Sequence, residues 1–254
     1  MLISFIAAHM TANGRTETRI AGNLVGHAVA EAADDGAIFA AIFNLLDPNP
    51  EQRWQLDGPA RELTIGGIRV MVLLKDEAGR INPNSASPEL LEALLRVTGS
   101  EAESARRLAA SIGEWVGSVP AARRQNAQLA EYRAAGLDYG PPGAPLETVD
   151  ELGRVLGMTP VVLAAIRPHL TLFGPPEPNP RGADPIVAAA LSRLAPLSQI
   201  ATAGNQTPQN PVIVRITATA SGPGNARITR SAIVRVGTAL PGGYTVLAWR
   251  GGSD

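Results

Sequence analysis

The sequence changes character at Asp76-Glu77-Ala78-Gly79-Arg80-Ile81-Asn82-Pro83-Asn84-Ser85-Ala86-Ser87-Pro88-Glu89-Leu90-Leu91. The residues before it, 65–74, form a nearly continuous apolar run that predicts a buried strand. The residues after Ser87 have helical spacing, with Ser87 as the N-cap and Pro88 at the first helical position. Asn82 and Asn84 are predicted to fix the turn between the two through side-chain bonds to the backbone. The stretch therefore leads the chain from a β part into a helical part.

The composition excludes several classes of function. The chain of 254 residues is 45% hydrophobic, only 4% aromatic, carries a formal net charge of −1 and has no cysteine. Disulfides, thiolate catalysis and zinc–thiolate sites are therefore excluded. The balanced charge gives no global reason to expect a nucleic-acid partner. No catalytic Ser/His/Asp grouping, phosphate loop or paired-carboxylate site stands out, so no enzyme activity is expected.

Residues 1–46 contain no proline and are predicted to form one long helix. Apolar and small residues recur every four positions at Ile20, Leu24, Ala28 and Ala32, a spacing that places them on one face and suits close packing against partner helices. The apolar start, residues 1–12, is about half of the roughly 20 residues that a membrane-spanning helix needs. It is either a short buried helix end or the trailing half of a membrane helix.

Beyond this helix the pattern alternates between β and helical periods. A short β signal at 53–56 precedes two strands at 62–65 and 68–75 that meet at Gly66-Gly67, a hairpin turn. Residues 85–173 are helical, and 174–210 are rich in Pro, Asn and Gly around one helix near 185–197. Residues 212–250 form three strands. The predicted divisions are 1–84 (helix and first part of a sheet), 85–173 (an inserted helical domain), 174–210 (a linker with one helix) and 211–254 (strands that complete the sheet).

Five segments, in order, resemble the K-type minor pseudopilin of the type II secretion system (general secretion pathway protein K). They are Arg15–Leu24, Asp76–Leu91, Tyr132–Leu137 with Tyr139–Pro141, Glu147–Leu152 with Leu156–Pro160, and Val246–Arg250. The resemblance implies an α+β, pilin-like fold: a long N-terminal helix on a small antiparallel sheet, with a large inserted all-α domain. This fold requires residues 60–75 and 212–250 to share one sheet.

The resemblance also implies a function. The protein would be a noncatalytic subunit that caps the tip of the pseudopilus and helps initiate its assembly for protein export. The I-type and J-type minor pseudopilins would be its partners, packed against Ile20, Leu24, Ala28 and Ala32 of the N-terminal helix. The chain would be a single-pass protein of the bacterial inner membrane with its globular part in the periplasm.

A calcium site is the one cofactor that the resemblance raises. The family carries acidic residues after a tryptophan, and the corresponding segment here, Glu114-Trp115-Val116-Gly117-Ser118-Val119, has lost them. Calcium prefers six to eight oxygen ligands, several of them carboxylates. Asp138, Glu147 and Asp150 remain as candidate ligands, and each is equally explained as a turn or cap residue.

The alternative function is a helix-hairpin-helix DNA-binding protein of the competence type. The candidate turns, 97–100 and 156–159, lack the paired glycines that let backbone amides approach phosphate. Arg106-Arg107 and Arg123-Arg124 belong to no longer basic run. Packing is therefore the preferred role of these turns.

Overall fold

The computed structural model describes residues 2–118, 127–194, 211–222 and 227–251, with side chains from residue 20 onward except at 127 and 128. The chain forms two compact units. The first unit comprises residues 1–75 and 210–254, and the second unit comprises residues 76–209. Both ends of the chain thus belong to the first unit, and the second unit lies between them in the sequence.

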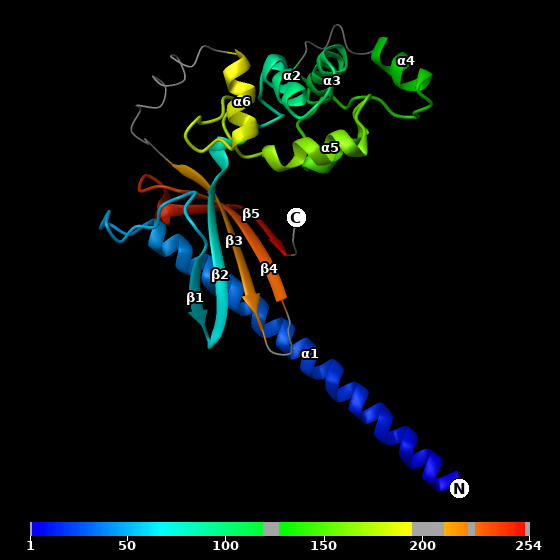
Figure 1. Ribbon diagram of the computed structural model, residues 1–254, viewed down its shortest axis with the longest axis vertical. Helices are drawn as coiled ribbons and strands as arrows, with labels where there is room; N and C mark the ends of the chain where they lie inside the picture. Colours follow the sequence, from blue (N-terminus) through cyan, green and yellow to red (C-terminus); the bar gives the residue numbers. More distant parts are fainter. Residues whose placement is uncertain (1, 119–126, 195–210, 223–226, 252–254) are drawn as a thin grey trace. The chain divides into compact units, whose positions relative to one another are not determined.

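The first unit consists of one long helix and one sheet, so the fold is α+β (Figure 1). Helix α1 (Leu2–Leu45) matches the predicted helix, and Pro48 and Pro50 follow its end. The five antiparallel strands lie in chain order and are β1 (Arg61–Ile65), β2 (Ile68–Asp76), β3 (Val212–Ser221), β4 (Arg227–Val236) and β5 (Tyr244–Gly251). Residues 60–75 and 212–250 therefore share one sheet, as the pilin-like fold requires.

The turn chemistry of the first hairpin agrees with the sequence. Gly66 and Gly67 have φ values of +56° and +81°, which residues other than glycine rarely adopt. Ile65 pairs with Ile68 across this turn. The expected β signal at 53–56 is wrong, because no strand forms there. Instead, the Trp54 amide donates to the Asn44 carbonyl, and the Arg61 guanidinium lies over the Trp54 ring.

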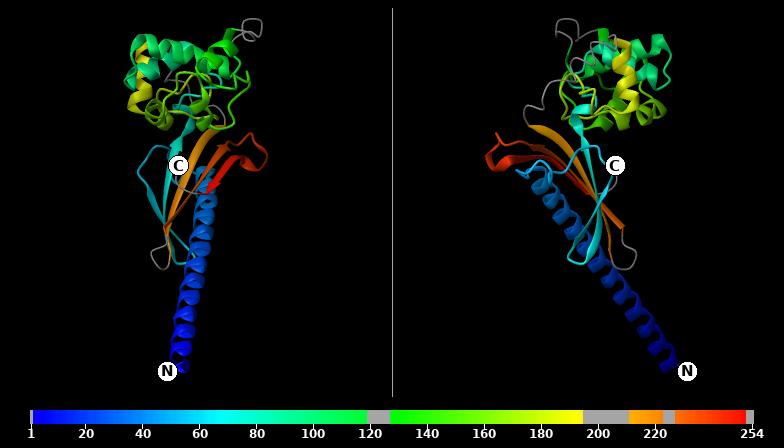
Figure 2. Two further views of the ribbon diagram at one scale, coloured as in Figure 1. Left: turned by 90° about the vertical axis from the view of Figure 1, so that its right-hand side faces the viewer. Right: turned by 60° about the vertical axis from the view of Figure 1, so that its left-hand side comes forward.

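Helix α1 packs across one face of this sheet (Figure 2). Small side chains dominate the contact, with Ala30, Ala37 and Ala41 fully buried. The strands contribute β-branched and small residues to this contact, and these allow the helix and the sheet to approach closely. The buried strand residues are Val70, Val72, Leu74, Val214, Ile216, Ala218, Ala220, Ala232, Val234 and Val236.

The second unit is built mainly from helices. The α-helices are α2 (Pro88–Val97), α3 (Ala102–Trp115), α4 (Ala127–Ala134), α5 (Pro160–Ile166) and α6 (Pro185–Leu194). The 3₁₀ turns are η1 (Glu77–Gly79), η3 (Val149–Arg154) and η4 (Arg167–His169). Among the described residues of this unit, the only β pairing is the isolated bridge between Ile81 and Leu170. The predicted N-cap is confirmed, since Ser87 Oγ accepts from the Leu90 amide at 3.2 Å.

Asn82 and Asn84 do more than fix the local turn. Asn82 Oδ1 accepts from the Asn84 amide, as predicted, and its Nδ2 donates to the Gly174 carbonyl at 2.9 Å. Asn84 makes two bonds to the backbone of Leu146, at 2.7 and 3.1 Å. The junction therefore ties together three segments that are far apart in the sequence.

Two boundaries differ from the sequence prediction. Residues 76–84 belong to the second unit and not to the sheet part, because Ile81 pairs with Leu170 and joins the second core. Residues 174–194 also belong to the second unit, although a linker was expected there. Helix α6 packs on α2 and buries Val187 and Ala190 completely, and its predicted continuation, 195–197, lies outside the described residues.

Candidate assembly surface

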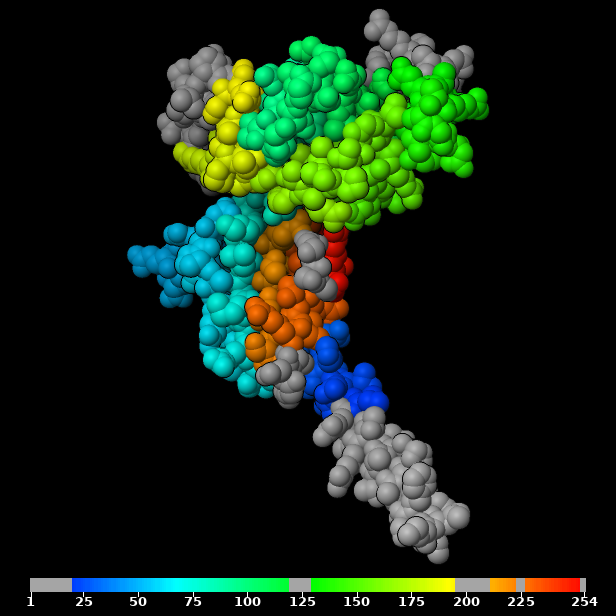
Figure 3. Space-filling model, turned by 45° about the vertical axis from the view of Figure 1, so that its right-hand side comes forward, coloured from blue at the N-terminus to red at the C-terminus, as the bar shows by residue number. Residues whose placement is uncertain are grey.

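The outward face of α1 is apolar and exposed. Ile20 and Leu24 are 54% and 66% exposed, and Ala28 and Ala32 are also exposed. We call these four residues the outer stripe. Figure 3 shows the first turns of α1 that are drawn in colour emerging beside the ends of the strands. The four residues predicted to pack against partners are therefore free of contacts that would bury them within this chain.

Ile20 and Leu24 lie on the same side of α1 as the buried Ile38 and Ile42, because eighteen residues make five turns, and yet they are exposed. Ala28 and Ala32 turn toward the opposite side. Positions three or four apart share a helix face, so Ala30, Ala33, Ala37 and Ala41 form the inner stripe. Phe43, at 76% exposure, continues the outer face toward the end of α1. Phe39 is partly covered by Trp249 of β5, with ring centroids 5.5 Å apart. The helix thus carries apolar and small residues that the sheet leaves uncovered.

No helix in the described part of the chain is long and apolar enough to cross a membrane. The exposed apolar face of α1 is of the kind that marks an interaction site on a protein surface.

The three candidate calcium ligands are exposed residues of the second unit. Asp138 lies in a bend after α4, Glu147 precedes η3, and Asp150 is in η3, where it pairs with Arg167. Glu151, the third residue of η3, completes a capping box, since its carboxylate accepts from the amide of the N-cap residue Thr148 at 2.6 Å. Among the described residues, no group of three or more His, Asp or Glu is placed to hold a metal ion. The assignment of these three residues as calcium ligands stays a prediction.

An aromatic pocket of about 440 Å³ lies in the second unit. Its described lining comprises Trp115, Tyr139, Gly140, Pro142 and Arg154. Trp115 packs against Tyr132 and Tyr139 with ring centroids 6.3 Å apart in both pairs. The Tyr132 hydroxyl accepts from the Leu156 amide at 3.0 Å, which fastens α4 to the segment after η3. The sequence pattern pointed to Trp115 but not to this cluster, because only folding brings Trp115 to the segment that holds the two tyrosines.

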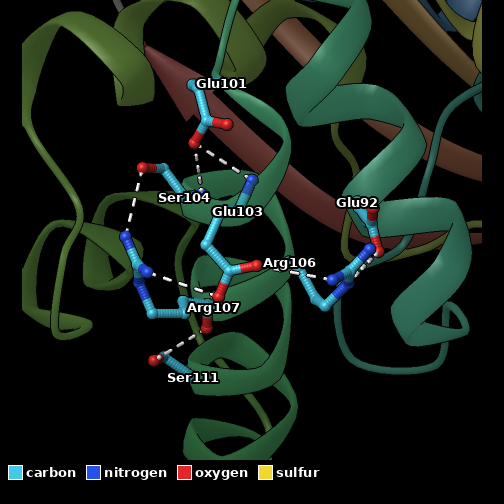
Figure 4. A network of polar contacts seen from close by, with 7 residues as sticks. All are labelled: Glu92, Glu101, Glu103, Ser104, Arg106, Arg107 and Ser111. Carbon is cyan, nitrogen blue, oxygen red and sulfur yellow. Dashed lines mark hydrogen bonds and ion pairs between the residues drawn. The ribbon is translucent and has the colours of Figure 1, made fainter.

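The basic pair on α3 is engaged in a surface network (Figure 4). Arg106 lies 3.7 Å from Glu92 of α2 and 3.4 Å from Glu103, and Arg107 lies 3.3 Å from Glu103. Glu101 accepts from the amides of Ser104 and Glu103, and these bonds lower the pKa of its carboxyl. Arg106 and Arg107 are thus paired with carboxylates, which disfavours them as phosphate ligands. Arg123 and Arg124 lie outside the described residues.

Comparison with known proteins points to one family. Residues 69–176 match the family model described as type II secretion system (T2SS), protein K. This part of the chain is thus similar to the type II secretion system protein K family. The match confirms the resemblance to the K-type minor pseudopilin and spans the end of the sheet's first hairpin and most of the second unit. No curated protein matches the chain.

A solved structure shows the same fold. It is a chain of the crystal structure of the GspK-GspI-GspJ complex from the type 2 secretion system of enterotoxigenic Escherichia coli. The TM-score is 0.62 at 17% sequence identity, over 95% of this chain and 100% of that one. The likeness in fold therefore extends over nearly the whole chain, beyond the residues that the family model matches.

Proposed function

We propose that this protein is a noncatalytic minor pseudopilin that caps the tip of a type II secretion pseudopilus and helps initiate its assembly. The family match supports the pseudopilin role. The observation that carries the proposal is the outer stripe of α1, four apolar or small residues that the sheet leaves exposed. A subunit that assembles through its N-terminal helix needs such an exposed apolar surface.

The proposed partners are the I-type and J-type minor pseudopilins of the same secretion system. The similar solved structure is a complex of GspK with GspI and GspJ. Small residues such as Ala28 and Ala32 let helix backbones approach closely, and Ile20 and Leu24 add apolar area. We place the partner helices against this stripe.

The second unit supports the tip position. It is inserted between β2 and β3, and we propose that it acts as an all-α domain whose bulk obstructs the addition of another subunit above it. A K-type subunit could then have neighbours below it but none above.

The proposed location is the inner membrane, with the globular part in the periplasm. We propose that the N-terminal part of α1 anchors the protein and that the sheet and the second unit lie outside the membrane. The helix-hairpin-helix DNA-binding alternative is less well supported, because Glu92 and Glu103 already pair with the arginines of α3.

The test is co-purification of this chain with the I-type and J-type proteins of the same secretion system. Ala28→Arg and Ala32→Arg place an unpaired cation in the proposed interface and should reduce complex recovery about tenfold or more. Ala110→Arg is the matched control, because Ala110 is an exposed helical alanine of the second unit. Equal recovery of all three variants would refute the role of the outer stripe.

A further inference from the structure

An ionisable side chain lies inside the helix–sheet contact of the first unit. Asp34 of α1 is fully buried, and neither of its carboxylate oxygens makes a well-formed hydrogen bond among the described residues. Its helix neighbours at positions 30, 33, 37 and 38 are Ala or Ile, all buried against the sheet. A charged carboxylate in such a place loses its hydration without compensation.

The charges near Asp34 do not neutralise it. On α1, Asp35 and Glu31 carry the same sign. On β4, the cation is Arg230, and its Nη1 lies 2.9 Å from Asp35 Oδ2. The residues that β2 and β3 bury against α1 are Val70, Val72, Leu74, Val214, Ile216, Ala218 and Ala220, none of which is charged. The nearby cation is thus already shared with Asp35.

These surroundings favour the protonated form of Asp34. Burial is the largest cause, repulsion by Asp35 is the second, and together they raise the pKa of Asp34 to about 7. The Ala220 backbone and Arg230 oppose the rise without cancelling it. An unfolded chain would titrate this group near 3.8.

We propose that Asp34 is a proton-dependent latch between α1 and the sheet. The neutral carboxyl is accommodated among the alanines of the contact, and its ionisation weakens the packing of α1 on β3 and β4. Since the folded state binds the proton more tightly than the unfolded state, stability falls as pH rises from about 4 to 7 and levels off above 7. The latch concerns packing within the first unit and does not depend on the proposed function.

Hydrogen exchange of the full chain, measured from pH 5 to pH 8 and corrected for intrinsic rates, tests the latch. Two-state linkage predicts that the opening constant of α1 and β3 rises about ninefold from pH 5 to 6, about fivefold from pH 6 to 7, and less than about twofold from pH 7 to 8. The peptides of α2 and α3 serve as an internal reference, because they belong to the second unit. Asp34→Asn, a neutral isostere, should remove this rise from the first unit.

Asp35→Asn is the matched variant. It removes the repulsion and frees Arg230 to pair with Asp34, so the levelling-off should move to lower pH while the rise itself remains. An unchanged pH dependence in Asp34→Asn would overturn the proposal. Carboxyl ¹³C NMR of the wild-type chain decides the matter even if the variant fails to fold. A resonance titrating near pH 7, in contact with Ala220, supports the latch, and the absence of any carboxyl titrating above pH 6 overturns it.

Discussion

At the scale of single residues, Asn84 joins two distant segments of the second unit. Its side chain makes both available bonds to the backbone of Leu146, which is buried. Asn84→Ala leaves the Leu146 amide and carbonyl without these partners and should destabilise the second unit by about 2 kcal/mol. Hydrogen exchange of residues 85–116 measures the loss. Asn49→Ala, at an exposed Asx turn, should change stability by less than about 0.5 kcal/mol; equal effects of the two variants would contradict the assignment.

Tyr132 allows a second test at this scale. Tyr132→Phe keeps the ring contacts with Trp115 but removes the acceptor of the Leu156 amide, at a cost of about 1 kcal/mol. Tyr139→Phe is the control, because the Tyr139 ring belongs to the same cluster and no hydrogen bond is seen for its hydroxyl among the described residues. Urea unfolding followed by tryptophan fluorescence compares the two variants. If Tyr139→Phe proves the more destabilising, the hydroxyl of Tyr132 is not the fastening group.

At the scale of elements, the two faces of α1 should respond differently to the same substitution. Ala37 is fully buried against the sheet, so Ala37→Leu overpacks the contact and should cost about 1–3 kcal/mol. Ala32 is exposed, and Ala32→Leu should leave the free energy of unfolding of the isolated chain nearly unchanged. Thermal unfolding of both variants checks this. A large loss with Ala32→Leu would mean that the outer stripe is buried within the chain.

Elements marked by local chemistry were predictable from the sequence. Helix α1, the Gly66-Gly67 hairpin and the Ser87-Pro88 start of α2 each depend on neighbouring residues, and all three were correctly placed. The segment 149–154 was predicted as part of a helix but forms a 3₁₀ turn, because its cap and acidic first turn suit both. The helix α6 was also predicted, but its packing on α2 was not, because that depends on contacts distant in the sequence.

The outer stripe was named from a four-residue period that is visible in the sequence. Its role as a partner surface stays a prediction. The burial of Asp34 was not predictable, because the neighbouring Asp35 has the same chemistry and only the direction of the helix relative to the sheet separates them. The pocket around Trp115 likewise depends on segments brought together by folding.

At the scale of the whole molecule, the second unit should be removable. Strands β2 and β3 are antiparallel neighbours, so the end of one and the start of the other lie at the same end of the sheet. Replacing residues 77–210 with an Asn-Gly turn should leave the first unit folded. Circular dichroism and hydrogen exchange of β4 check this expectation. An unfolded product would show that the sheet depends on the second unit for its stability.

The placement of β2 beside β3 also affects how the chain folds during its synthesis. Synthesis delivers α1, β1 and β2 first, yet β2 has no neighbour on one side until the entire second unit has been translated. Contacts between residues so far apart form slowly, because closing a long loop costs chain entropy. During that interval an apolar strand edge stays open to other chains. The newborn polypeptide should therefore need a chaperone until its last forty or so residues emerge, a count set by where β3 begins.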